Sequence, residues 1–189
     1  MTHTDFRDIL EPVQLTISVF VPFFGVLAVT GLRRPGSDRR LTRRWCAAQG
    51  FAAGSALVGV LVTAIVIAWS GGSWPSGTGL AWLVVGSVLV QLIAQSTGIA
   101  AGLLLRRPVI AMAATIVVPM SVTAVLSAID PGGGLVRWLT PYGNARALLA
   151  GEPTAALAVV VLLWCVLPNV LGAARIRTAR APDRASARS

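Results

Sequence analysis

The residues best placed for chemistry in this sequence are uncharged and share one face of a long apolar run. Ser87, Gln91, Gln95, Gly98 and Gly102 follow one another at spacings of four, four, three and four, so they form one stripe on a helix. Amide side chains in lipid need hydrogen-bond partners, and a Gly-x-x-x-Gly pair lets another helix approach closely. The stripe therefore indicates either a packing face between helices or the lining of a substrate path.

The sequence lacks the residues for metal, nucleotide-hydrolysis or proton-relay chemistry. Two cysteines, Cys46 and Cys165, and one histidine, His3, are too few for a zinc site. All 16 basic residues are arginine, so the lysine of a phosphate-binding loop is missing. We expect a protein that is not an enzyme, that holds no cofactor or metal, and that takes energy for any active transport from another polypeptide.

Five apolar runs must position the stripe, and they lie at residues 13–32, 47–69, 80–105, 109–129 and 155–174. Each has about 20 residues or more, which is enough to cross about 30 Å of hydrocarbon as a helix. None contains Asp, Glu, Lys, Arg or His. Because lipid offers no partners to the backbone, the predicted fold is an all-α polytopic membrane bundle with five spans and a transmembrane domain at 13–174.

The arginines between the runs predict which way the helices point. Three segments carry them: Arg33, Arg34, Arg39, Arg40, Arg43 and Arg44; Arg106 and Arg107; and Arg175, Arg177, Arg180, Arg184 and Arg188. By the positive-inside rule these segments are cytoplasmic. We expect an external amino-terminal tail at 1–12, a cytoplasmic basic tail at 175–189, and a multi-pass protein of the plasma membrane.

The net charge of +9 has a membrane explanation. Each arginine beside a span contacts anionic headgroups and contributes about 1 kcal/mol, so we expect the lipid bilayer as partner and not nucleic acid. Residues 1–12 lack the features of a secretory signal. An outside amino terminus then leaves two alternatives: the first run translocates a short acidic tail, or an upstream helix precedes it in the full protein.

Two connecting segments predict further helices. After Pro35-Gly36, Ser37 can cap a short helix at the cytoplasmic interface. This helix includes Arg39, Arg40, Leu41, Arg43 and Arg44 and runs to Trp45. It is either a headgroup anchor or a docking surface for a cytosolic partner. On the other side, Asp130-Pro131 and three glycines end the fourth run, and we expect an external helical pair from about residue 135 to 150.

Three stretches occur in a fixed order along the chain. They are Phe24-Gly-Val-Leu-Ala-Val-Thr-Gly31, Gly98-Ile-Ala-Ala-Gly-Leu-Leu-Leu-Arg-Arg-Pro108 and Trp138-Leu-Thr-Pro-Tyr-Gly-Asn-Ala-Arg-Ala-Leu-Leu-Ala-Gly151. Together they resemble permease subunits of type 2 ATP-binding-cassette exporters, in particular the short actinobacterial-style permeases. The chain departs from this family at Leu32, where the family commonly has Glu, and in lacking a counterpart of the family's first span.

The resemblance implies roles for the basic segments. Residues 37–45 correspond to the coupling helix that docks in a groove of a separate ATPase, and the turn at 106–108 corresponds to a smaller cytoplasmic contact. The implied docking residues are Arg39, Arg40, Leu41, Arg43, Arg44, Arg106 and Arg107. The implied partners are an ATP-binding-cassette ATPase and a second permease subunit, identical or not. The alternative that the residues leave open is a non-transporting assembly or immunity partner that packs by its glycine and glutamine faces.

Overall fold

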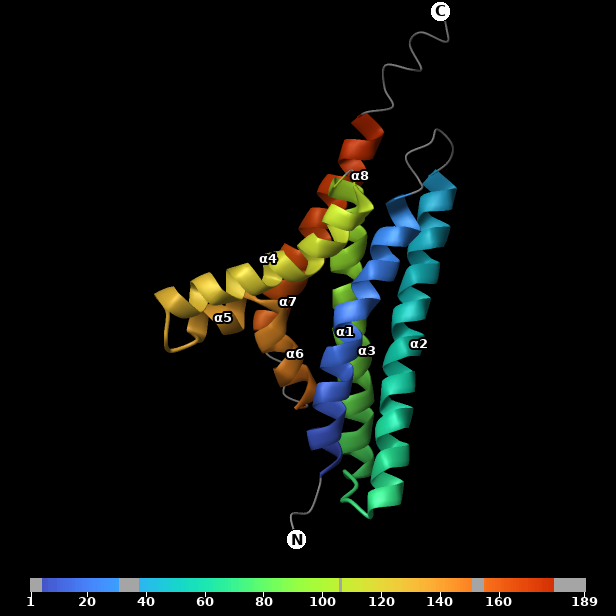
Figure 1. The fold of residues 1–189 in the computed structure, drawn as a ribbon, viewed down its shortest axis with the longest axis vertical. Coiled ribbons are helices and arrows are strands. Elements are labelled where there is room, and N and C mark those ends of the chain that lie inside the picture. Colours follow the sequence, from blue (N-terminus) through green and yellow to red (C-terminus); the bar gives the residue numbers. More distant parts are fainter. Residues whose placement is uncertain (1–4, 31–37, 106, 151–154, 179–189) are drawn as a thin grey trace, which may run out of the picture.

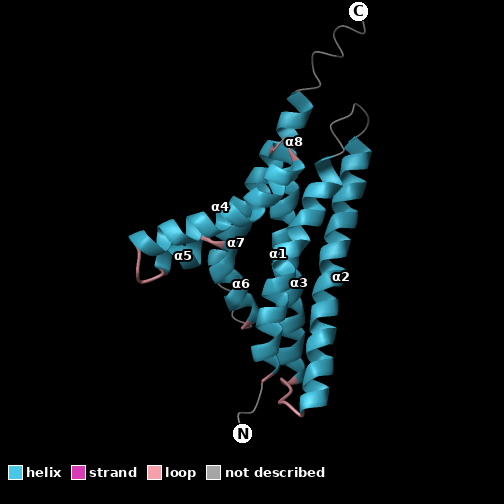
Figure 2. Ribbon diagram, viewed as in Figure 1, coloured by secondary structure: helices cyan, strands magenta, loops and turns pink. Residues whose placement is uncertain are grey.

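The computed structural model describes residues 5–30, 38–105, 107–150 and 155–178, and in these ranges every regular element is a helix (Figure 2). The elements are α1 (Phe6–Thr30), α2 (Asp38–Ser70), α3 (Gly77–Leu104), α4 (Pro108–Ile129), α5 (Gly134–Leu139), α6 (Pro141–Leu149), α7 (Ala156–Val160), the π-helical segment η2 (Val161–Val166) and α8 (Leu167–Thr178). Five helical stretches are long and apolar enough to cross a membrane. The prediction of an all-α polytopic membrane bundle is therefore confirmed.

The three longest helices, α1, α2 and α3, lie side by side and form the main bundle (Figure 1). Near the α2–α3 turn, Phe6 and Leu10 of α1 are buried together with Ile67 of α2 and Leu83 of α3. Leu148 of α6 joins the same cluster. This core ties the short helices that follow α4 to the end of the bundle at which the described chain begins.

Helix α4 diverges from the main bundle (Figure 1), and only Ala111 and Thr115 within it are buried. Helices α5 and α6 then fold back, and α6 packs against α3. The continuous stretch α7–η2–α8 returns along α3 to the other end of the molecule. An exposed apolar helix such as α4 is stable in a membrane because lipid tails are as apolar as its side chains.

Local residues set several helix ends. The Ser76 hydroxyl accepts a hydrogen bond from a first-turn amide of α3 at 3.2 Å, which is the usual role of an N-cap serine, and Pro108 opens α4. Between α4 and α5, the Asp130 carboxylate accepts a hydrogen bond from the amide of Leu135 at 2.8 Å. Gly133 has a φ of 75°, a conformation that favours glycine. The predicted helical pair is present as α5 and α6, while its external position stays a prediction.

Two helices extend beyond the predicted spans. Helix α1 begins at Phe6, so much of the segment predicted as an external tail is helical, because Phe6 and Leu10 are buried and the Phe6 ring packs on Trp74 at 5.7 Å. Helix α2 runs without a break for 33 residues, or about 50 Å. The predicted interfacial helix is therefore the first part of α2, and it projects beyond about 30 Å of hydrocarbon.

The described arginines of the predicted cytoplasmic segments gather at one end of the molecule. Arg43 and Arg44 lie near the start of α2, Arg107 precedes α4, and Arg175 lies near the end of α8. Figure 1 shows these three places at the same end. The arrangement agrees with the predicted alternation of basic and nonbasic loops, and the direction across the membrane stays a prediction. Residues 31–37, residue 106 and residues 179–189, which carry the other predicted cytoplasmic segments, lie outside the described residues.

Candidate functional site

The polar stripe of α3 faces α1. The side-chain amide of Gln91 donates to the backbone carbonyl of Gln14 at 2.8 Å and to its Oε1 at 3.0 Å. Gln14 in turn donates from Nε2 to the carbonyl of Ala56 in α2 at 2.9 Å. Both glutamines are fully buried, so this chain of hydrogen bonds joins the three helices of the main bundle.

The glycines of the stripe allow the backbones of α1 and α3 to meet. A Cβ atom at Gly98 would collide with the backbone of Pro22, and one at Gly102 would lie 2.6 Å from Cγ2 of Val29. From the opposite side, a Cβ at Gly25 would lie 2.8 Å from the carbonyl oxygen of Gln95. Small residues at such a contact are typical of helix pairs in membranes, where close packing replaces the hydrophobic effect.

These contacts bear on the two interpretations of the stripe. Ser87, Gln91 and Gln95 are fully buried, and the stripe packs against α1 instead of lining an open path. Within the described part of the chain, neither amide atom of Gln95 has a hydrogen-bond partner, and the Ser87 hydroxyl also lacks one. The contacts favour the packing interpretation, at the cost of buried polar atoms that the fold leaves unpaired.

The paired and unpaired glutamines predict opposite effects of the same substitution. Gln91→Leu should destabilise the protein by about 1 kcal/mol, because it removes two hydrogen bonds between α3 and α1. Gln95→Leu should stabilise it by about 1 to 3 kcal/mol, because it removes two buried polar atoms without partners. Thermal unfolding of the two purified variants in one detergent measures the difference. Equal shifts in the same direction would contradict the hydrogen-bond assignment.

A second polar network holds α8 against α3. Asn169 donates to the carbonyls of Ser96 at 2.9 Å and Cys165 at 2.7 Å, and Gln49 of α2 donates to the Ser96 hydroxyl at 2.8 Å. The sequence-based predictions did not include Gln14, Gln49 or Asn169. The available signal was the same as for the stripe, namely an amide inside an apolar run.

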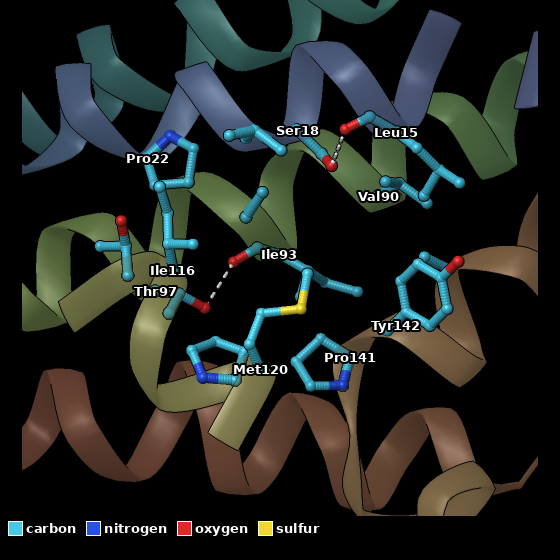
Figure 3. Close-up of a pocket in the computed structure, with 15 residues that line it drawn as sticks. Leu15, Ser18, Pro22, Val90, Ile93, Thr97, Ile116, Met120, Pro141 and Tyr142 are labelled. Atoms are coloured by element: carbon cyan, nitrogen blue, oxygen red, sulfur yellow. Dashed lines mark hydrogen bonds between the residues drawn. The ribbon is translucent and has the colours of Figure 1, made fainter. Parts of the chain in front are cut away.

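A groove separates the main bundle from α4 and α6. It has a volume of about 140 Å³ and is lined by Leu15 and Pro22 of α1, Val90 of α3, Met120 of α4 and Tyr142 of α6, among others. Figure 3 shows Leu15, Val90 and Tyr142 at one end of the groove and Pro22 with Ile116 at the other. The lining residues of α1 extend from Leu15 to Pro22, so the groove runs along the middle of α1. It is partly open at its side.

The serine and threonine hydroxyls that line the groove already donate hydrogen bonds. Ser18 donates to the Leu15 carbonyl at 2.7 Å and Thr97 donates to the Ile93 carbonyl at 3.1 Å, as Figure 3 shows. Thr115 donates to the carbonyl of Met112 at 2.7 Å. Each bond lies within one helix, so these side chains present mainly their carbon atoms. The groove therefore suits an apolar molecule or an acyl chain, since a charged ligand would find no compensating charge on its walls.

The predicted docking residues have different surroundings. Arg43 and Arg44 are exposed, and one Nη of Arg44 donates to the Ala28 carbonyl at 3.4 Å. Leu41 packs instead against an internal cluster of α1, α2 and α3, and Arg107 is exposed at the start of α4. The side chains of Arg39 and Arg40, and the whole of Arg106, lie outside the described residues.

The described residues include no group of three side chains that could hold a metal ion. The site is thus a groove with apolar walls, next to a bundle sealed by glycine and glutamine contacts. Comparisons with known proteins add no identity to this geometry, because no family model, curated protein or solved structure matches the chain.

Proposed function

We propose that this chain is a membrane-spanning permease subunit of an ATP-driven exporter in the plasma membrane. The groove between α1, α3, α4 and α6 carries the proposal. It lies along the middle of an apolar helix and is enclosed by helices on several sides. A carrier needs such a space at membrane depth, whereas a protein that only packs against a partner does not.

Two prolines support movement of the groove walls. Pro22 of α1 and Pro119 of α4 both line the groove, and both lie inside their helices. A proline inside a helix removes one backbone hydrogen bond and favours a bend at that point. The groove can therefore widen if α4 and the ends of α1 bend about these prolines, while Pro22 itself stays packed against Gly98.

The energy for this movement would come from a partner. The five predicted spans contain no Asp, Glu, Lys, Arg or His, which argues against coupling to an ion gradient through a charge at membrane depth. The exposed Arg43, Arg44 and Arg107 offer a basic surface at one end of the molecule. An ATPase that binds there would shift the permease between states by its different affinity for them, and a second permease subunit would complete the path.

Affinity purification from native membranes tests this proposal. The full chain, carrying a tag, is captured in a mild detergent and the bound chains are identified by mass spectrometry. We expect an ATP-binding-cassette ATPase in amounts comparable with the tagged chain. Stable capture of membrane proteins without any ATPase would support the alternative, a non-transporting assembly or immunity partner.

A further inference from the structure

A cluster of polar side chains lies at one end of the groove. Arg146 of α6 forms an ion pair with Glu11 of α1, with 2.8 Å between Nε and Oε1. The same guanidinium lies over the ring of Tyr142 at 5.2 Å from its centroid. Tyr142 lines the groove together with Leu15, and Glu11 is one helical turn before Leu15 on the same face of α1. The cluster therefore lies next to the groove.

The cluster is accessible and retains binding capacity. Arg146 is 58% exposed and Glu11 is 38% exposed in their side chains. A guanidinium has five N–H donors, which is more than a single carboxylate uses, and a carboxylate accepts more bonds than one arginine fills. Both partners can therefore hold each other and still bind a polar group from the surroundings.

The charges of the cluster point to one type of headgroup. Its two formal charges, one positive and one negative, lie next to each other and sum to zero. An arginine fork matches a phosphate group, while the carboxylate of Glu11 attracts a cation and repels a second anion. A headgroup with a phosphate followed by a primary ammonium complements both charges. A purely anionic headgroup would satisfy Arg146 and be repelled by Glu11.

We propose that the groove and this cluster form one binding site for a zwitterionic phospholipid with an ammonium headgroup. One acyl chain lies in the groove, the phosphate binds Arg146 and the ammonium binds Glu11. The groove volume of about 140 Å³ resembles that of an apolar cavity of about 150 Å³ that accepts benzene. It therefore encloses part of one chain, and the rest of the lipid lies along the open side. The identification of this lipid as the exported cargo rests on the proposed function.

Photolabelling of the purified full chain tests the site. The probe is phosphatidylethanolamine with a diazirine near the end of one acyl chain. The comparison probes are phosphatidylglycerol and diacylglycerol with the same chain. We expect the phosphatidylethanolamine probe to label the groove segments of α1 and α4 most strongly, with the adducts located by mass spectrometry. Equal labelling of these segments by all three probes would overturn the proposal.

Matched variants separate the headgroup contact from a general effect of charge. Arg146→Gln should lower labelling by phosphatidylethanolamine about tenfold, because a charge-assisted hydrogen bond is lost. Arg137→Gln removes the same charge from the exposed face of α5 and should leave labelling unchanged. Glu11→Gln should abolish the preference over phosphatidylglycerol. If Arg146→Gln labels as strongly as Arg137→Gln, the assignment of the phosphate contact is wrong.

A second pair of variants tests the chain-binding part. Ala94→Phe places a ring in the groove and should remove labelling there, whereas Ala113→Phe on an exposed position of α4 should not. Arg146→Gln and Arg137→Gln, which both change exposed residues, keep the test valid if Ala94→Phe fails to fold. The amount of ATPase that co-purifies with the chain is measured in the same samples. Labelling that depends on Arg146 without a bound ATPase would uphold the lipid site and contradict the proposed permease function. A bound ATPase with labelling that does not depend on Arg146 would uphold the permease function and contradict the lipid site.

Discussion

Replacing Gly98 with valine should remove most of the folded protein from the membrane. The Cβ of any side chain at this position would collide with the backbone of Pro22, and neither backbone can move without separating α1 from α3. Overpacking a core usually costs about 1 to 3 kcal/mol. We expect a larger cost here, because separating the helices also breaks the hydrogen bonds between Gln14 and Gln91.

Gly54→Val is the matched control for this variant. Gly54 also lies in the middle of a membrane helix, but a Cβ there has nothing within 4 Å. We expect its stability to change by less than about 0.5 kcal/mol, as for most surface substitutions. The measurement is the monodisperse peak in size-exclusion chromatography of solubilised membranes, followed by thermal unfolding. Equal yields of the Gly98 and Gly54 variants would show that α1 does not pack on α3 as described.

Substituting serine for Arg43 and Arg44 should release the proposed ATPase partner while the bundle stays folded. Both side chains are exposed, on the part of α2 that projects beyond the expected membrane. If they pair with acidic groups of the ATPase, their loss costs about 2 kcal/mol, which is a roughly thirtyfold weaker complex. Replacing Arg39 and Arg40 with serine as well should weaken the complex further. Quantitative mass spectrometry of the captured complex measures it.

The control removes two arginines from elsewhere. Arg7→Ser with Arg137→Ser deletes the same charge from exposed positions on α1 and α5, and the bound ATPase should not change. Because arginines also set topology, each variant needs a single cysteine at position 38 and labelling from outside intact cells, with Cys46 and Cys165 both replaced by serine. Labelling from outside in the parent chain would overturn the predicted orientation. Unchanged ATPase capture by the Arg43 and Arg44 variant, with topology preserved, would count against docking there.

The sequence alone was sufficient for the five spans and for the helical pair after α4. Insertion into lipid depends on the length of an apolar run and on the charges beside it, and both are properties of a short stretch of chain. The start of α1 was missed for the same reason. Arg7, Asp8 and Glu11 resemble a solvated tail, and only the burial of Phe6 and Leu10 between other helices shows why the helix begins there.

Only the tertiary structure shows which residues the polar stripe contacts and where the groove lies. The partner of Gln91 is Gln14, which is 77 residues away, and the groove combines residues from four helices. No pattern within one run distinguishes a side that faces lipid from a side that faces another helix, because both surroundings are apolar. Which residues meet across the bundle is therefore set by how closely the helices approach, at Gly98 above all, and hydropathy does not report it.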